Sequence, residues 1–189
     1  MPKKILLLFT GAKGVGKTEL IYNFNSKRPD YLQGGSDYYS TFFMDKKEKI
    51  FIDIYTPMNT GSISSFDYKR AHGIVVMYDV TNPLSFTEID NILPFIKENY
   101  KTSIVYIVGN KTDIKGTRKV SYEEGYAKSL IYKCMFAETS ALDTLSTAPF
   151  YKNLLDEILI TAKIEKTINL NYDPEAGGGC MGKNTCQLL

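Results

Sequence analysis

The chain of 189 residues has little of several features that mark particular classes of protein. It has three cysteines, an odd number, which argues against a disulfide framework and for a reducing compartment. It has no apolar stretch long enough to cross a bilayer, and no N-terminal signal sequence is expected. Its 23 basic and 21 acidic residues give a net charge of +2 without a block of one sign, so nucleic acid is not an expected partner.

The chain has a single histidine, His72, which stands just before an apolar run typical of a buried strand. We therefore expect this histidine to be structural. No internal repeat is present, and the length suits one hydrophobic core but is short for two. These features predict a single domain, and no side chain is predicted to be catalytic.

Glycine is concentrated in one segment where it has a chemical use. Residues 11–18, Gly-Ala-Lys-Gly-Val-Gly-Lys-Thr, fit the phosphate-loop pattern G-x-x-x-x-G-K-[ST] at every position. They follow the apolar run 5–9, which predicts a strand buried on both faces. A chance match in a glycine turn is the alternative, but such a match would rarely lie between a buried strand and an amphipathic stretch.

Backbone chemistry explains how this loop would hold an anion. Its glycines let the N–H groups approach a phosphate, and a helix expected from Lys17 adds the positive end of its dipole. Lys17 is expected to reach the terminal phosphates and the Thr18 hydroxyl to ligate Mg²⁺. The predicted phosphate-binding residues are Lys13, Gly14, Val15, Gly16, Lys17, Thr18 and Glu19.

A second segment, Asn110-Lys111-Thr112-Asp113, follows the apolar run 104–108. Guanine presents two adjacent donors that the Asp113 carboxylate can accept, whereas adenine has an acceptor at the ring nitrogen. A site built in this way rejects the wrong base by roughly 10⁴-fold. We expect Asn110 to tie this loop to the phosphate loop and the stem of Lys111 to cover one face of the base. Taken alone, the motif is also typical of a polar turn.

These motifs resemble those of the Ras superfamily of small GTPases, and most of all the Rab branch. Besides the two segments above, the family pattern matches Glu138-Thr139-Ser140-Ala141 and, in a Rab-like form, residues 70–73 and 78–86. The similarity covers residues 4–163. In the family the Ser-Ala pair offers backbone N–H groups to the guanine carbonyl oxygen, so the resemblance assigns three further residues to the base: Ser140, Ala141 and Leu142.

Alternating strand and helix patterns predict an α/β fold. The resemblance implies that residues 1–165 form a single P-loop GTPase domain. The sheet is expected to be mainly parallel and six-stranded, with helices on both faces and the ligand at the carboxyl ends of the strands. Pro94 is expected to kink one helix. The predicted strands are 4–10, 38–44, 49–56, 74–80, 103–109 and 134–138, and the predicted helices are 17–25, 84–99, 121–132 and 149–164.

The chain departs from the family where the second switch should lie. Family members carry Asp-x-x-Gly-Gln, in which the Asp acts on the metal side and the Gln orients the attacking water. Counting back without gaps places Asp53, Thr56 and Pro57 at these positions, and Asp53 is assigned to the metal on this count. Matching the strand phase instead places Thr56, Asn59 and Thr60 there. Neither register supplies both the glycine and the glutamine, so intrinsic GTP hydrolysis is expected to be slow.

The first switch and the phosphate loop also differ from the family. Lys13 stands where relatives hold a small residue, and it would either crowd the transition state or offer it positive charge. The family threonine that contacts Mg²⁺ falls on Ser36, which we assign to the metal, with a plain glycine-serine turn as the alternative. The following strand is a candidate effector surface, although such aromatics are more often core. Its aromatic residues are Tyr38, Tyr39, Phe42 and Phe43.

The C-terminal residues Cys186-Gln187-Leu188-Leu189 fit the C-a-a-X prenylation pattern, with the final leucine favouring geranylgeranyl. Residues 166–189 are expected to form a tail, in which 167–185 read as a flexible tether. One lipid gives reversible anchoring, so Cys180 is a candidate palmitoylation site or else a spare thiol. Rab relatives commonly end in paired cysteines, so this ending departs from that branch. Cys134 is expected to be buried in a strand.

The resemblance implies a membrane-anchored switch in vesicle trafficking that binds GTP or GDP with Mg²⁺. Its expected partners are effectors and exchange and activating factors, and a monomer is expected. Its expected location is the cytoplasmic face of an intracellular or plasma membrane, with a cytosolic pool. A scaffold that binds GTP with negligible hydrolysis is one alternative. A P-loop phosphotransferase or ATPase is another, which Asp113 disfavours.

Overall fold

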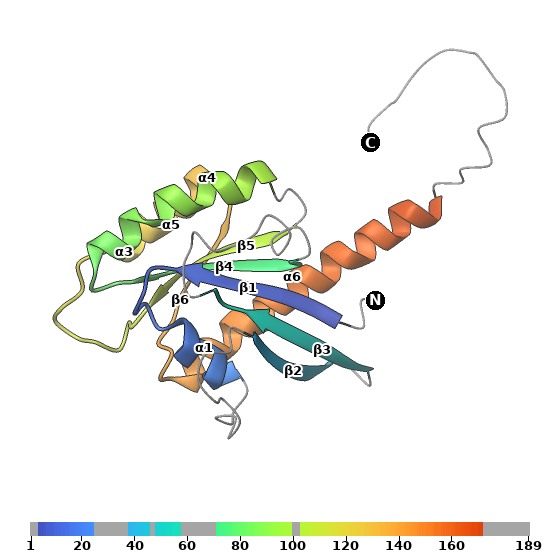
Figure 1. Cartoon of the computed structure of the whole chain (residues 1–189), viewed down its shortest axis with the longest axis horizontal. Coiled ribbons are helices and arrows are strands. Elements are labelled where there is room, and N and C mark those ends of the chain that lie inside the picture. Colours follow the sequence, from blue (N-terminus) through green and yellow to red (C-terminus); the bar gives the residue numbers. More distant parts are fainter. Residues whose placement is uncertain (1–3, 25–37, 46–47, 58–70, 100–102, 172–189) are drawn as a thin grey trace, which may run out of the picture.

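The computed structural model describes residues 4–24, 38–45, 48–57, 71–99 and 103–171. These residues form a six-stranded sheet in the order β2-β3-β1-β4-β5-β6 (Figure 1). All neighbouring strands are parallel except β2 and β3, which are antiparallel. The strands are β1 Lys4–Gly11, β2 Tyr38–Asp45, β3 Glu48–Tyr55, β4 Gly73–Asp79, β5 Ile104–Asn110 and β6 Met135–Glu138.

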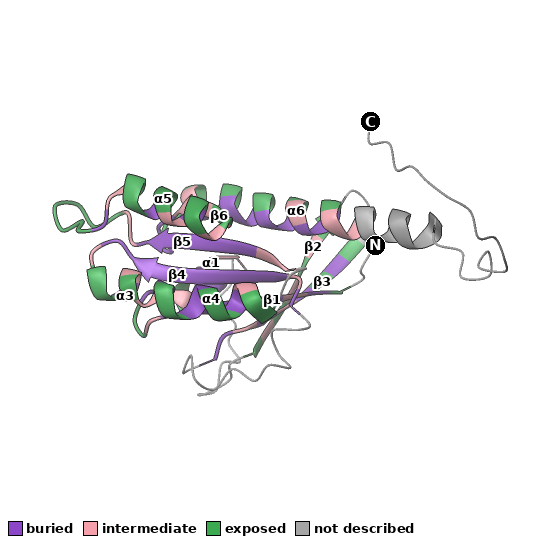
Figure 2. Ribbon diagram, turned by 90° about the horizontal axis from the view of Figure 1, so that it is seen from above, coloured by how far each residue is buried: buried purple, intermediate pink, exposed green. Residues whose placement is uncertain are grey.

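Helices cover both faces of the sheet, which confirms the predicted fold class. In Figure 1, α3, α4 and α5 lie on one side, while α1 and α6 lie on the other. The helices are α1 Lys17–Phe24, α3 Pro83–Thr87, α4 Ile89–Asn99, α5 Tyr122–Tyr132 and α6 Thr144–Asn171. Because the central strands are covered on both faces, β4 is buried along its whole length (Figure 2).

The β2–β3 hairpin has mixed faces, as the alternation of its residues predicts. Ile50, Ile52 and Ile54 of β3 are buried. On β2, Tyr38 and Phe42 are exposed. The other two aromatic residues of β2, Tyr39 and Phe43, pack against the core. One face of this hairpin therefore belongs to the core and the other faces solvent.

The predicted helix over residues 84–99 is divided in the structure. Asn82 caps α3, with its side-chain oxygen accepting the Leu84 N–H, and α3 ends at Thr87 with Glu88 as its C-cap. The division lies at Glu88, whereas Pro94, the expected site of a kink, lies inside α4. Cys134 is also not buried in a strand as expected: it precedes β6 and is half-buried.

The last helix begins earlier and ends later than predicted. Asp143 precedes it, and the Asp143 carboxylate accepts the Leu145 N–H at 2.9 Å, so α6 begins at Thr144 with Pro149 inside it. The helix continues to Asn171, so residues 167–171 are helical where a tether was expected. The remainder of the tail, with Cys180 and Cys186, lies outside the described residues.

Candidate functional site

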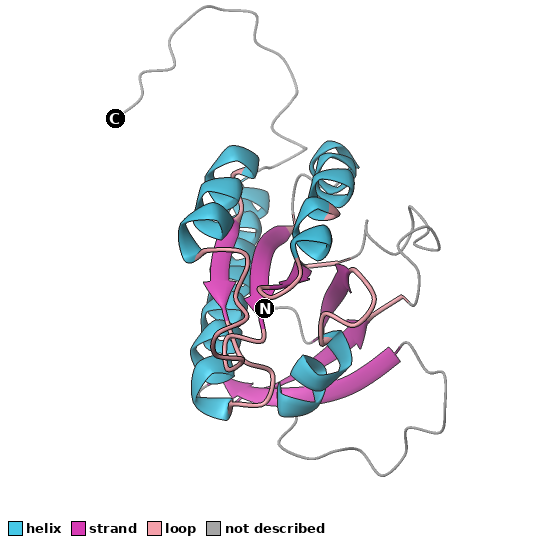
Figure 3. Cartoon of the chain, turned by 90° about the vertical axis from the view of Figure 1, so that its left-hand side faces the viewer, coloured by secondary structure: helices cyan, strands magenta, loops and turns pink. Residues whose placement is uncertain are grey.

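The loops that follow β1, β4, β5 and β6 gather at the carboxyl edge of the sheet (Figure 3). The loop between β1 and α1 depends on three glycines with positive φ: Gly11 (+132°), Gly14 (+82°) and Gly16 (+93°). A side chain at Gly11 would clash with the Met77 carbonyl oxygen, and one at Gly16 with the Asn110 side-chain amide. Around Gly14 there is open space. The loop therefore has the open, amide-rich form that can accept phosphates.

Lys17 lies over this loop. Its Nζ donates to the carbonyl oxygens of Gly11 and Ala12, both at 2.8 Å. Burial lowers the pKa of Lys17, and the negative charge of Glu88 opposes that shift. The first bond within α1 joins the Leu20 N–H to the Gly16 oxygen, so the earlier amides of the helix are available to an anion.

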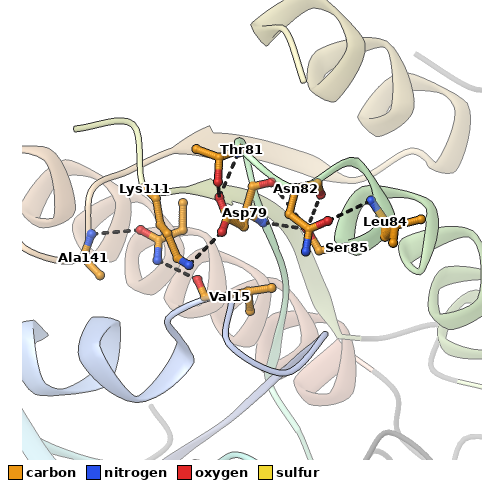
Figure 4. Close-up of polar contacts among 9 residues, drawn as sticks. Val15, Asp79, Thr81, Asn82, Leu84, Ser85, Lys111 and Ala141 are labelled. Atoms are coloured by element: carbon orange, nitrogen blue, oxygen red, sulfur yellow. Dashed lines mark hydrogen bonds and ion pairs between the residues drawn. The ribbon is translucent and has the colours of Figure 1, made fainter. Parts of the chain in front are cut away.

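Asn110 joins the two predicted ligand loops, as the sequence predicts. Its Nδ2 donates to the Val15 oxygen of the phosphate loop at 2.8 Å. Its Oδ1 accepts the Ala141 N–H at 2.9 Å (Figure 4). With 1% of its surface exposed, Asn110 is a buried bridge between the P-loop, β5 and the loop after β6.

Lys111 adopts the left-handed conformation, with φ of +70°. Its Nζ lies 2.7 Å from Oδ2 of Asp79, the last residue of β4. The other carboxylate oxygen of Asp79 accepts the Thr81 N–H at 2.8 Å and the Thr81 hydroxyl at 2.7 Å. Burial raises the pKa of Asp79, but the hydrogen bonds from Lys111 and Thr81 outweigh burial and hold the pKa below its usual value.

Asp113, the predicted base-reading residue, lies exposed on the loop after β5. The Ser140 hydroxyl donates to its Oδ1 at 2.6 Å and accepts the Leu142 N–H at 3.3 Å. The Ser140 N–H itself donates to the Ser146 hydroxyl at 2.9 Å. The amides predicted to face guanine are therefore directed at protein oxygens, and Ser140 orients the Asp113 carboxylate through its side chain.

The prediction that Asp53 binds the metal is wrong. Asp53 lies within β3, opposite Leu6 of β1. There its carboxylate binds Lys4 Nζ at 2.6 Å and the Ser40 hydroxyl at 2.9 Å. Gly11 lies five positions beyond Leu6 along β1, which places Asp53 roughly 16 Å from the start of the phosphate loop. The other register, which places Thr56 at the family Asp position, fits the structure better. Thr56 is buried on the same face as Ile54 and directly follows the end of β3.

Thr18, which is predicted to ligate Mg²⁺, is exposed at the start of α1 beside Lys17. Ser36, Asn59 and Thr60 lie outside the described residues. Within the described part of the chain, no three His, Cys, Asp or Glu side chains are grouped to hold a metal. A hydroxyl ligand combined with phosphate oxygens and water suits Mg²⁺, which is rarely caged by protein groups alone.

His72 has a structural role, as expected. The ring Nδ1 of His72 accepts the backbone N–H of Leu6 at 3.0 Å, and the backbone N–H of His72 donates to the carbonyl oxygen of Leu6 at 2.8 Å. Its carbonyl oxygen accepts the Ile104 N–H at 3.0 Å. The residue thus joins β1 and β5 across the start of β4.

Known proteins share this arrangement of motifs. The model of the Ras family matches residues 4–160, most of the chain. The chain belongs to the Ras family. Among its relatives, this Ras-family chain is 31% identical to the Ras-related protein RABC1 of Arabidopsis thaliana, over 85% of this chain and 79% of that protein. It is 30% identical to human Ras-related protein Rab-8B, over 91% of this chain and 86% of the relative. It is 28% identical to Ras-related protein RabC of Dictyostelium discoideum, over 95% of this chain and all of that protein. It is therefore a Rab-like small GTPase of the Ras superfamily.

The sequence alone predicts no role for two residues that the structure places in this site, Asp79 and Ser146. Asp79 belongs to a segment that served only to mark the Rab-like resemblance. A carboxylate that ends an otherwise apolar, buried strand indicates a partner, because a buried charge is costly unless it is paired. The identity of that partner, Lys111, is set by the pairing of β4 with β5, in which Asp79 stands opposite Asn110.

Proposed function

We propose that this Ras-family protein is a guanine-nucleotide switch that is anchored to a membrane and acts in vesicle trafficking. The observation that carries the nucleotide part is the Asn110 bridge, because one buried amide holds the phosphate loop and the base loop in a fixed relation. A ligand with a polyphosphate at one end and a purine at the other fits these two loops. The trafficking role rests on the resemblance to Rab proteins.

Different residues of the chain would bind different parts of the nucleotide. Lys17 has three donors and uses two on the Gly11 and Ala12 oxygens, which leaves one for a phosphate oxygen. Thr18 would supply a hydroxyl to Mg²⁺, whose charge neutralises that of the phosphates. Asp113, with one oxygen held by Ser140, would accept the two guanine donors.

Nucleotide content tests this function. The full chain, purified rapidly from cells and denatured, should release GTP or GDP in a stoichiometric amount on chromatography. Adenosine nucleotides in their place, or no nucleotide from a folded protein to which none can be loaded, would contradict the proposed guanine site.

Hydrolysis of GTP is proposed to be slow. In the register set by the strand phase, the position of the family glutamine falls on Thr60, and a threonine side chain is too short to orient water as a glutamine does. Lys13 is exposed on the phosphate loop, where its charge would lie near the terminal phosphate. Single-turnover hydrolysis should be slower than that of a Rab protein with the glutamine, measured side by side, and an equal rate would overturn the proposal.

The missing glutamine also favours a second function, a scaffold that holds GTP and hydrolyses it negligibly. Turnover in the presence of a cell extract separates the two functions, because an activating factor can supply an arginine to the transition state. Acceleration by the extract indicates a switch, and no turnover in either condition indicates a scaffold. Both functions involve effectors, for which the exposed aromatics Tyr38 and Phe42 of the β2–β3 hairpin are the proposed contact.

Membrane attachment is proposed to occur through a prenyl group on Cys186, with an acyl group on Cys180 as the second anchor. Among the described residues, none of the helices combines the length and apolar character needed to span a bilayer. The protein is proposed to be a monomer on the cytoplasmic face of a membrane, in exchange with a cytosolic pool.

Cys186→Ser should move the protein from the membrane to the soluble fraction, with Cys134→Ser as control. Membrane association of Cys186→Ser equal to that of the control would exclude prenyl anchoring at this residue.

A further inference from the structure

The turn between β4 and α3 holds a buried carboxylate that the nucleotide-binding motifs do not include. The Asp79 side chain is 9% exposed, and its Oδ2 lies 2.7 Å from Lys111 Nζ. Its Oδ1 accepts two hydrogen bonds from Thr81, one from the amide and one from the hydroxyl. One oxygen is therefore fixed by the local turn and the other is presented to the lysine of the base loop.

The position of this carboxylate is set by the first turn of α3. The backbone N–H of Asp79 donates to the Ser85 hydroxyl at 3.0 Å, and that hydroxyl donates to the backbone carbonyl oxygen of Asn82 at 2.7 Å. Asn82 in turn caps α3 by accepting the Leu84 N–H at 3.1 Å. Figure 4 shows this chain of contacts leading from the cap of α3 to Lys111. The carboxylate is thus preorganised by bonds that do not involve a ligand.

The ion pair fixes the far end of the Lys111 side chain. A free lysine side chain samples many rotamers, and ordering it on a ligand costs conformational entropy. Here the backbone of Lys111 is held in the base loop, and the ammonium is held at Asp79, so the four-carbon stem runs between two fixed points. The pair carries no net charge, so the stem presents an apolar surface beside a neutral ion pair.

We infer that Asp79 is a positioning residue for guanine-nucleotide binding, which holds the stem of Lys111 in place as one wall of the base pocket. The inference rests on the proposed function, since it takes the loop of residues 110–113 to hold the base. Asp79 acts through Lys111 and does not itself contact the nucleotide.

A double-mutant cycle on the full chain tests this inference through the dissociation rate of a fluorescent GDP analogue. Asp79→Asn keeps the shape of the side chain but removes its charge, and GDP should leave about tenfold faster. Lys111→Met keeps an apolar stem but lacks the ammonium. The double variant should release GDP no faster than Lys111→Met alone, because both changes free the same stem. An Asp79→Asn rate equal to the wild-type rate, or multiplicative effects of the two changes, would overturn the inference.

Asp90→Asn is the matched control. Asp90 also forms an aspartate–lysine pair, with Lys128 at 2.6 Å, but between α4 and α5. Its replacement should leave GDP dissociation unchanged. A change equal to that of Asp79→Asn would show that loss of any such pair loosens the domain, and the specific role of Asp79 would be wrong.

Base discrimination separates a positioning role from general support of the loop. Inosine diphosphate lacks the exocyclic amine that Asp113 is proposed to read, so the ratio of GDP to IDP affinity reports the position of Asp113. Asp79→Asn should weaken both nucleotides equally and keep this ratio. A collapse of the ratio towards one would show that Asp79 supports the whole loop and would overturn the inference.

A milder variant covers the outcome in which Asp79→Asn does not fold. Thr81→Val removes one of the two donors that orient the carboxylate and should accelerate GDP release by about two- to threefold. Wild-type dissociation from Thr81→Val would then count against the inference. If the wild-type chain itself binds no GDP, the proposed function fails, which is a different result from normal binding that is insensitive to Asp79.

Discussion

Three side chains near the nucleotide site each join segments that are far apart in the sequence. Asn110 contacts the phosphate loop and the loop after β6. Ser140 holds the carboxylate of Asp113, and Asp79 holds the ammonium of Lys111. The role of Asn110 could be predicted from its motif. The other two contacts could not, because the partners are 27 and 32 residues apart and meet only when the strands pair.

The charge of Asp79 predicts a dependence of stability on pH. Its pKa is held below the usual value by Lys111 and Thr81 despite burial, so the folded state favours the ionised form. This stabilisation is present above the ordinary pKa of aspartate and is lost as the pH falls through the lower pKa of the folded state. The wild type should therefore be more stable than Asp79→Asn by about 2 kcal/mol at pH 7, with a smaller difference in strong acid.

Urea unfolding of the two proteins, at neutral pH and at a series of acid pH values, measures this difference. Asp90→Asn serves again as the control, because the Asp90 carboxylate, unlike that of Asp79, is about half exposed. A wild-type advantage that stays constant down to strong acid would contradict the assigned ion pair.

At the scale of elements, every strand was predicted within one or two residues. The central strands β1, β4 and β5 are continuous apolar runs because they are covered on both faces, whereas β2 and β3 alternate because one face of their hairpin meets solvent. Helix limits were harder, since they depend on caps. Asn82 and Asp143 each accept a backbone N–H two residues further on, and these bonds start α3 and α6. Asp53 was misplaced because an ungapped count ignored the two-residue period of β3, which its buried isoleucines follow.

The cap of α6 gives a prediction at this scale. Asp143→Ala removes the acceptor for the Leu145 N–H and should lower the free energy of unfolding by about 1 kcal/mol. Asp156→Ala, within the same helix, removes only an exposed pair with Lys152 and should cost less than about 0.5 kcal/mol. Chemical denaturation of both variants measures the difference. Equal costs would show that Asp143 does not act as the cap.

For the whole molecule, the sheet places the phosphate loop, the base loop and the loop after β6 at one edge, which is where ligands of such sheets bind. The match to the Ras family over residues 4–160 agrees with this arrangement. The departures from the family concern hydrolysis, since the strand-phase register places Thr60 where the family has its glutamine. Under the proposed function, we therefore expect this chain to bind the nucleotide well and to hydrolyse it slowly.

The central claim is that Asp113 makes the site specific for guanine. The most direct measurement is the affinity of the full chain for GDP and for ADP, with and without Asp113→Ala. The wild type should prefer GDP by about 10⁴-fold, and the variant should lose most of this preference through weaker GDP binding. If wild type and variant bind both nucleotides alike, the assignment of a guanine site is contradicted.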